Sequence, residues 1–254
     1  MMKLHIDSVS FSFDGKRNVL ENLSMHVKSG EFVSIVGPSG SGKSTLFSLI
    51  GGIFKPNTGS IKLDGKNING LRGHVSYMPQ QPALLPWRSI LENVILGGEL
   101  SGSVDQEKAR ELLVKAGLAD YEKAYPHELS GGMKQRAAFI RSLVSPQEIM
   151  CLDEPFSALD ELTRLQMQKW LLSVWEENRR SVLFITHSME EAILLSDRIY
   201  VLSARPATVI KEVHVPFPRP RNEQQLLGRE FLDLKRELYN LLQPMGGSQF
   251  ENHG

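Results

Sequence analysis

The stretch "IVGPSGSGKSTLF", Ile35 to Phe47, joins an apolar run to a pattern with helical spacing. It places Gly37, Gly42, Lys43 and Ser44 in the spacing G-x-x-x-x-G-K-[ST]. Glycines let backbone N–H groups turn inward around phosphate oxygens, and a helix that begins at Lys43 directs its positive dipole end at the same charge. The stretch therefore predicts a phosphate-binding loop (P-loop) between a buried strand and a helix.

The residues of this loop suggest separate roles around a nucleotide. We expect Lys43 to neutralise the β- and γ-phosphates and the Ser44 hydroxyl to ligate Mg²⁺. The alternative, a glycine-rich turn with no ligand, does not explain the lysine followed by a hydroxyl. The predicted nucleotide-binding residues of the loop are Gly37, Pro38, Ser39, Gly40, Ser41, Gly42, Lys43, Ser44 and Thr45.

A second strand ends in two acidic residues. In "EIMCLDEP" the four apolar residues Ile149 to Leu152 precede Asp153 and Glu154. Asp153 is placed to hold Mg²⁺ through water, and Glu154 to orient or deprotonate the attacking water. Two adjacent acids can also form a solvated turn, but their combination with a P-loop favours the catalytic interpretation.

A third apolar run, "SVLFITH", ends in His187. A lone histidine at a strand end usually has no special role. Ligands of open α/β sheets, however, bind at the carboxyl ends of the strands, where His187 would meet the P-loop and Glu154. We therefore predict that His187 contacts the γ-phosphate.

The order of strands and helices predicts an α/β fold. Strands that alternate with helices indicate a mostly parallel sheet with helices on both faces. Residues 3–36 alternate in short runs typical of an N-terminal antiparallel β layer, and residues 88–135 carry helical spacing, predicting a helical insertion. We expect one ATPase domain over 1–221, followed over 222–254 by a short C-terminal helix and a tail.

Composition narrows the classes of function. Lys plus Arg is 29 and Asp plus Glu is 29, so zero net charge gives no support for a nucleic-acid partner. No apolar stretch approaches the roughly 18 to 20 residues that span a bilayer, so we expect a cytosolic protein whose membrane contact comes through a partner. The single cysteine, Cys151, is predicted to be a small buried apolar residue.

The stretch "LSGGMKQR", Leu129 to Arg136, resembles the signature of the ATP-binding cassette (ABC) ATPases. Gln80 in "YMPQQPALLPW" resembles the family's Q-loop, "SALD" (Ser157 to Asp160) its D-loop, and His187 its switch histidine. Order and approximate spacing agree from about residue 3 to 210. The resemblance implies a P-loop NTPase core, ATP and Mg²⁺ as cofactors, and Gln80 as a metal ligand beside Ser44 and Asp153.

The resemblance also implies a head-to-tail dimer. In it, Ser130, Gly131 and Gly132 of one subunit would cap the γ-phosphate held by the partner's P-loop, with Asp160 nearby. A glycine-bearing helix start is physically a second anion site, although Ser130 can equally be a simple helix N-cap. Binding of ATP would close the dimer and hydrolysis would reopen it.

An aromatic residue is expected at the adenine. By the same resemblance Phe13, in "FSFDG", stacks on the base, where the family more often has tyrosine. Phe11 is the competing candidate, and both can also be core residues.

Two segments are similar to importer ATPases for nitrate, sulfonates, taurine and thiamine precursors: residues 84–100 and 201–221. Trp87 would lie beside the groove that receives a permease helix, or pack the helical insertion. The implied partners are a second ATPase subunit, expected to form a homodimer, integral membrane permease subunits and an extracytoplasmic solute-binding protein, at the cytoplasmic face of the membrane. No additional regulatory domain is expected after residue 221.

Two other classes of function fit the sequence less well. Soluble cassette ATPases that remodel ribosomes or DNA generally carry two cassettes or a long coiled-coil insertion, and neither is present here. A P-loop kinase for small molecules would not explain "LSGGMKQR" or "SALD". The sequence does not identify the transported solute.

Overall fold

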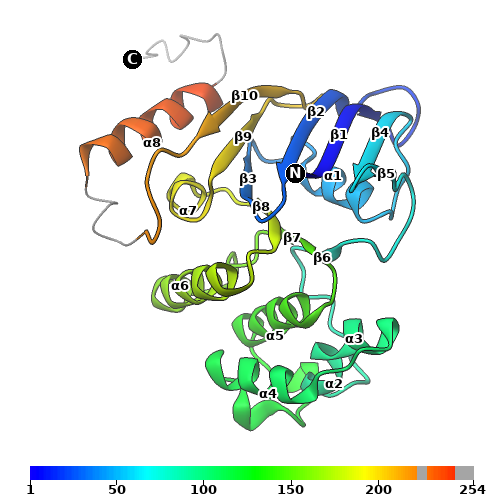
Figure 1. Cartoon of the computed structure of the whole chain (residues 1–254), viewed down its shortest axis with the longest axis vertical. Helices are drawn as coiled ribbons and strands as arrows, with labels where there is room; N and C mark the ends of the chain where they lie inside the picture. The colour runs from blue at the N-terminus through cyan, green and yellow to red at the C-terminus, as the bar shows by residue number, and fades with distance from the viewer. Residues whose placement is uncertain (222–227, 244–254) are drawn as a thin grey trace, which may run out of the picture.

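A six-stranded, mostly parallel sheet forms the centre of the protein in a computed structural model that describes residues 1–221 and 228–243 (Figure 1). Its order is β10 (Val209–His214), β9 (Arg198–Leu202), β3 (Phe32–Val36), β8 (Ser181–Ile185), β7 (Ile149–Asp153) and β6 (Ser76–Met78). β10 pairs antiparallel with β9, and the other pairs are parallel. Every residue of β3, β7 and β8 is buried, as expected of strands covered on both faces. The predicted α/β class is confirmed.

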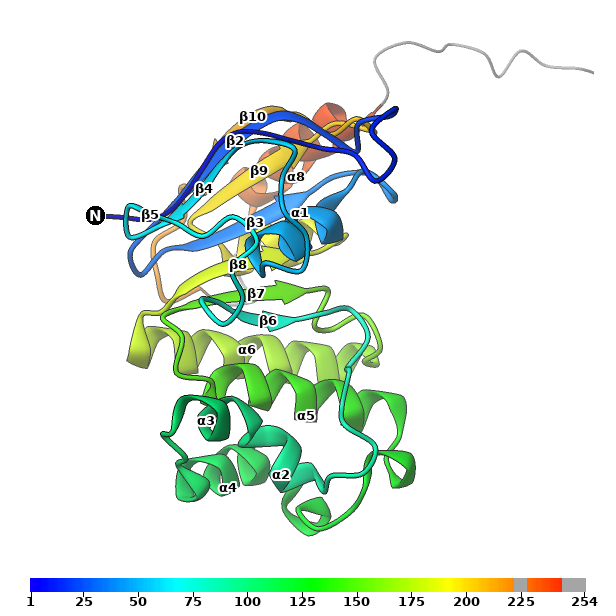
Figure 2. The same ribbon diagram turned by 90° about the vertical axis from the view of Figure 1, so that its right-hand side faces the viewer.

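A second, antiparallel sheet covers part of the core sheet, as predicted. Its order is β2 (Leu20–Lys28), β1 (Met2–Phe11), β4 (Thr58–Leu63) and β5 (Lys66–Asn67). Helix α1 (Lys43–Ile50) lies between the two sheets (Figure 2). Ile6 of β1, Leu46 of α1 and Ile35 of β3 belong to one apolar cluster, so burial of this cluster fixes the P-loop between the two layers.

The helical part lies below the sheet in Figure 2. It comprises α2 (Ile90–Val94), α3 (Leu96–Ser101), α4 (Gln106–Lys115), α5 (Gly131–Val144) and the short 3₁₀ helices Ala119–Tyr121 and Pro126–Glu128. Helix α5 begins inside the predicted 88–135 insertion and continues to Val144, because its buried face packs on α2 and α4. Helix α6 (Glu161–Asn178) lies between this part and the core sheet.

Two helices in the C-terminal part of the chain pack beside the core sheet. Helix α7 (Met189–Leu195) and helix α8 (Arg229–Leu242) pack together, with Phe231, Leu234 and Leu238 of α8 buried. Strands β9 and β10 were not assigned from the sequence. The predicted tail after residue 243 lies outside the described residues. None of the helices within 1–221 and 228–243 has the length and apolarity that crossing a bilayer requires.

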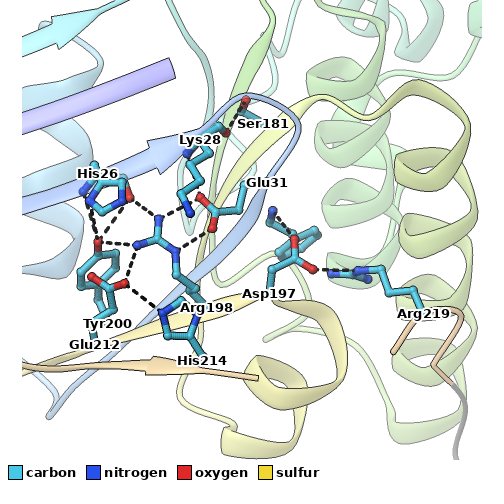
Figure 3. Close-up of polar contacts among 11 residues, drawn as sticks. His26, Lys28, Glu31, Ser181, Asp197, Arg198, Tyr200, Glu212, His214 and Arg219 are labelled. Atoms are coloured by element: carbon cyan, nitrogen blue, oxygen red, sulfur yellow. Dashed lines mark hydrogen bonds and ion pairs between the residues drawn. The ribbon is translucent and has the colours of Figure 1, made fainter. Parts of the chain in front are cut away.

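A buried ionic network fastens the two sheets at the edge opposite the strands' carboxyl ends (Figure 3). Arg198, 2% exposed at the start of β9, donates to both carboxylate oxygens of Glu31 at 2.6 and 2.8 Å. The same guanidinium donates to Glu212 of β10 at 2.7 Å and to the carbonyl of His26 in β2 at 2.9 Å. Because these contacts join β2, β9 and β10, they hold the two sheets in a fixed relation. This supports the edge of the core sheet where the parallel strands have their carboxyl ends.

Candidate nucleotide site

The P-loop runs from the end of β3 to the start of α1 in a conformation that requires glycine. Gly40 has φ 73° and Gly42 has φ 111°, both in the left-handed region. A Cβ atom at Gly42 would lie 2.9 Å from Cγ1 of Val19 and 3.0 Å from Cδ2 of Leu20. The loop is therefore held tightly against the chain that follows the 12–18 turn.

Lys43 lies at the first position of α1 and is 5% exposed. Its ammonium Nζ donates to the carbonyls of Gly37 and Pro38, each at 2.9 Å. Burial lowers the pKa of Lys43, while the nearby carboxylates of Glu154 and Asp153 oppose that shift. The ammonium is thus placed beside the N-terminal amides of a helix, where a phosphate group gains from both.

Asp153 ends β7 beneath the P-loop and is 2% exposed. Burial raises the pKa of its carboxyl group, and a hydrogen bond with the Ser44 hydroxyl partly opposes the shift. Its Oδ1 atom is buried without a partner among the described residues. A carboxylate oxygen with spare capacity next to a hydroxyl is a donor set that suits Mg²⁺, so these residues fit that ion.

The metal would need further oxygen ligands. Within residues 1–221 and 228–243, no group of three or more His, Cys, Asp or Glu side chains could hold a metal alone. Mg²⁺ commonly takes one or two protein oxygens and completes its octahedron with phosphate oxygens and water. The pair formed by Ser44 and Asp153 therefore suits Mg²⁺ that arrives with a nucleotide.

Glu154 follows directly and carries the carboxylate that faces the cleft. Its φ of 49° lies in the left-handed region, and its N–H donates to the Ile185 carbonyl at 3.0 Å. One carboxylate oxygen accepts a hydrogen bond from Nε2 of Gln80 at 2.9 Å, and the other contacts Nε2 of His187. Side chains from three loops therefore meet at one carboxylate, an arrangement that can activate a water molecule.

These residues surround a cleft of about 250 Å³. It is lined by Phe13, Val19, Ser39, Gly40, Gly42, Lys43, Ser44, Thr45, Gln80, Glu154, His187 and Arg205. Ten of the residues predicted from the sequence are among them, while Asp153 lies buried below and Gly37, Pro38 and Ser41 form the base of the loop. The structure thus brings the predicted P-loop, Q-loop, strand-end acids and switch histidine together.

The aromatic residue at the cleft is Phe13. Its side chain is 61% exposed and its ring packs edge-to-face against Phe11 and Phe54, with centroid distances of 5.0 and 5.4 Å. Phe11 is 6% exposed and belongs to the apolar core. Of the two candidates, Phe13 is the one that is exposed and lines the cleft.

The signature segment lies apart from this cleft. Ser130 is the N-cap of α5 and its Oγ accepts from the N–H of Met133 at 3.3 Å, which is the simple capping role considered above. A Cβ atom at Gly131 would meet no described atom within 4 Å, and one at Gly132 would lie 3.3 Å from Leu159 of the D-loop. Asp160 caps α6 in the same manner, accepting from Thr163 at 3.0 Å. None of these residues lines the described cleft.

Three residues of the site were not predicted. Gln135 of α5 is 1% exposed and donates from Nε2 to the Glu154 carbonyl at 3.3 Å, so the signature helix touches the loop of the catalytic acid. Its position inside "LSGGMKQR" was a usable signal. Val19 and Arg205 line the cleft from segments with no motif, and only the fold brings them there.

Comparison with known proteins shows the family of the chain. The family model described as "ABC transporter" matches residues 20–157. A nitrate import ATP-binding protein of Synechocystis is 40% identical, covering 95% of this chain and 95% of its own. A formylaminopyrimidine import ATP-binding protein of Halalkalibacterium halodurans is 41% identical, covering 94% and 96%.

A solved structure shares the fold. It is the dimeric, post-hydrolysis state of an ATP-binding cassette bound to ADP and Pi, with a TM-score of 0.76 and 30% sequence identity over 85% of this chain and 100% of that one. The chain therefore has ATP and Mg²⁺ as its cofactors and ATP hydrolysis as its activity. From the family model and the import ATP-binding relatives, the chain belongs to the ABC transporter family, as an ATPase subunit of the import type.

Proposed function

We propose that this protein powers the import of a small solute through a membrane permease by hydrolysing ATP between two copies of itself. One observation carries the proposal. The cleft around Lys43 and Glu154 holds the groups needed to bind and cleave a triphosphate, while Ser130 at the start of the signature helix is not among the residues that line it. Each chain then supplies two complementary halves of a nucleotide site.

The residues of the cleft divide the chemical work. Lys43 and the amides at the start of α1 bind the β- and γ-phosphates. The Glu154 carboxylate accepts a proton from the attacking water, and His187 and Gln80 hold that carboxylate in position. Ser44 and Asp153 hold Mg²⁺, which neutralises charge on the phosphate oxygens. Phe13 stacks on the adenine.

The second subunit completes the nucleotide site. The Ser130 hydroxyl and the amides of Gly131 and Gly132 approach the γ-phosphate of the nucleotide bound by the partner, and the D-loop residue Asp160 lies at the same interface. ATP thus stabilises the closed dimer because it binds both halves, and hydrolysis lowers that stabilisation. The dimeric state of the related cassette bound to ADP and Pi supports this assembly.

A groove between the core and the helical part suits a permease helix. It has a volume of about 470 Å³ and is lined on one side by β6 and on the other by α3 and α5. Leu100 at its rim is 83% exposed, and Trp87, beside the Q-loop, is 71% exposed rather than packed in the helical part. Closure of the dimer would move this groove and the permease with it, placing the protein at the cytoplasmic face of a membrane.

The relatives and the segments 84–100 and 201–221 support a proposal for the class of solute. We propose a small anion or a thiamine-precursor-like solute: nitrate, taurine, another sulfonate or a formylaminopyrimidine. Its selectivity would reside in the permease and in an extracytoplasmic solute-binding protein.

Reconstitution with its cognate permease tests the proposal. Proteoliposomes containing both proteins and the solute-binding protein should hydrolyse ATP faster with one of these solutes and accumulate it. Vesicles carrying the Glu154→Gln variant should do neither. Recovery of the native protein with ribosomes and without an integral membrane protein would instead support the soluble, non-transport class of cassette ATPase.

A further inference from the structure

A buried carboxylate outside the proposed chemistry lies directly behind the switch histidine. Glu191, in the first turn of α7, is 8% exposed. Its Oε1 accepts a hydrogen bond from Nε2 of Gln168 at 2.9 Å, and its Oε2 contacts the hydroxyl of Thr186. Burial raises the pKa of Glu191. A buried carboxylate is costly unless its oxygens are bonded, so its partners are fixed along with it.

The contacts of Glu191 close a ring around one residue. The Thr186 hydroxyl accepts from the N–H of Ser188 at 3.0 Å, and the Ser188 hydroxyl accepts from the N–H of Glu191 at 3.3 Å. The residue between Thr186 and Ser188 is His187. The residues on both sides of His187 are therefore bonded to each other and to Glu191, Thr186 through the carboxylate and Ser188 through the backbone N–H.

The imidazole of His187 has little packing to hold it. Its side chain is 49% exposed, and its Nε2 contacts Glu154. A cavity of about 120 Å³ adjoins it, lined by His187, Glu154, Thr186 and Glu191 among others. Since neighbouring atoms do not fill the space around the ring, its direction depends on the backbone from which it projects.

The other partner of Glu191 leads to the D-loop. Gln168 lies on α6, one turn after Arg164. The Arg164 guanidinium donates to the carbonyl of Leu159 at 3.0 Å, within the D-loop, and Asp160 caps the same helix. One face of α6 therefore holds both the D-loop and, through Gln168, the Glu191 carboxylate.

We infer that Glu191 is a positioning residue for hydrolysis: anchored to α6 through Gln168, it fixes the backbone on both sides of His187 and so directs the imidazole at Glu154. The inference deepens the proposed function and rests on the role given there to His187. Segment 186–188 then links helix α6, which follows the D-loop, to the Glu154 carboxylate. Loss of this link should misplace His187 without affecting the groups that bind ATP.

Two neighbouring glutamates give a matched test. Glu191→Ala should lower kcat for ATP about 10- to 100-fold, the cost of a small misplacement of a catalytic group, with KM and the Kd for ATP within twofold of wild type. Glu191→Gln keeps an acceptor for Thr186 and should restore most of kcat. The control Glu190→Ala removes an exposed carboxylate that pairs with Lys235, and its kinetics should match wild type.

A pair of Thr186 variants tests the same inference if Glu191→Ala does not fold. Thr186→Val removes the hydroxyl that links Glu191 to Ser188, and it should lower kcat like Glu191→Ala. Thr186→Ser keeps the hydroxyl and should stay close to wild type. Equal kcat for the valine and serine variants would overturn the inference.

Combination with His187→Ala separates positioning from general loosening. If Glu191 acts through His187, Glu191→Ala and Thr186→Val should cost nothing further in the His187→Ala background. In the NMR spectrum, the imidazole resonances of His187 should shift and broaden in Thr186→Val. Additive losses, or unchanged imidazole resonances, would overturn the inference.

The controls distinguish this inference from the proposal beneath it. A wild-type rate in His187→Ala would remove the role of His187 from the proposed function, and the inference with it. A large loss in His187→Ala together with wild-type kinetics in Glu191→Ala and Thr186→Val would overturn the inference alone.

Discussion

Nε2 of His187 contacts Oε1 of Glu154 across the ends of two neighbouring strands, β8 and β7. The strand register explains the contact, because Asp153 pairs with Ile185 and each catalytic side chain comes one or two residues later. Gln80 donates to the other oxygen of Glu154 at 2.9 Å. The carboxylate is thus fixed by two side chains and faces the cleft that holds Lys43.

Glu154→Gln should bind ATP but hydrolyse it about 10²- to 10⁴-fold more slowly, because an amide cannot take the proton of the attacking water. The variant should accumulate as a closed dimer with Mg²⁺ and ATP, whereas the wild type should not. Phosphate release measures the rate, and light scattering coupled to size exclusion measures the mass.

The control for this variant lies at the other end of β7. Glu148, just before the strand, has a side chain that is 78% exposed and pairs with Lys3. Glu148→Gln should hydrolyse ATP at the wild-type rate. Normal turnover in Glu154→Gln would show that another group acts as the base.

Phe13→Ala should weaken nucleotide binding, because base stacking on an aromatic ring contributes about 1–3 kcal/mol. The Kd for ATP should rise while that for inorganic tripolyphosphate stays unchanged, and Phe13→Tyr should resemble wild type. Isothermal titration measures both ligands. A parallel loss for tripolyphosphate would mean that Phe13 supports the P-loop rather than the base.

Sequence motifs with a fixed spacing predicted most residues of the nucleotide site. The P-loop pattern located Lys43 and Ser44, and the acid pair after an apolar run located Asp153 and Glu154. The structure brings Lys43, Ser44 and Glu154 to one cleft, and backbone geometry at a strand end or helix start allows few residue types, so the sequence records it directly. Strands β3, β7 and β8 were predicted as short, mostly apolar runs.

Features that depend on contacts between segments far apart in the sequence could not be predicted. Strands β9 and β10 were missed, because neither has a motif: β9 pairs with β3, far away in the sequence, and β10 is an edge strand that pairs with β9. Arg205 reaches the cleft because the turn after β9 is hydrogen-bonded to the chain at Val19. Arg219 and Arg221, which belong to no motif, donate to carbonyls at the end of α7.

Ser130→Arg should abolish cooperative hydrolysis yet leave the Kd of the monomer for ATP unchanged, because Ser130 lies outside the cleft of its own chain. An arginine side chain would occupy the space proposed for the partner's γ-phosphate. Mixing this variant with Lys43→Ala makes the test decisive, since a mixed dimer would contain one intact site. Partial recovery of activity is expected, and weaker ATP binding by the Ser130→Arg monomer would contradict a role in trans.

Asp153→Asn should stabilise the metal-free protein at neutral pH. Burial raises the pKa of Asp153 above its usual value of 3.8, so the folded state binds this proton more tightly than the unfolded state. The free energy of unfolding therefore falls as pH rises from about 3.8 through the raised pKa, and the buried charge destabilises the fold above that window. Asparagine carries no charge at any of these pH values, and each gain of about 1 kcal/mol would raise Tm by about 2–4 °C.

Thermal unfolding in EDTA, at pH 5 and at pH 7.5, measures this effect. The advantage of Asp153→Asn over wild type should be larger at pH 7.5, and it should reverse when Mg²⁺ and ATP are added, because the wild-type carboxylate then holds the metal and the variant cannot. A wild type that is more stable than the variant in EDTA at pH 7.5 would mean that the unpartnered Oδ1 is satisfied in solution. Equal stabilisation of both proteins by Mg²⁺ and ATP would remove Asp153 from the metal site.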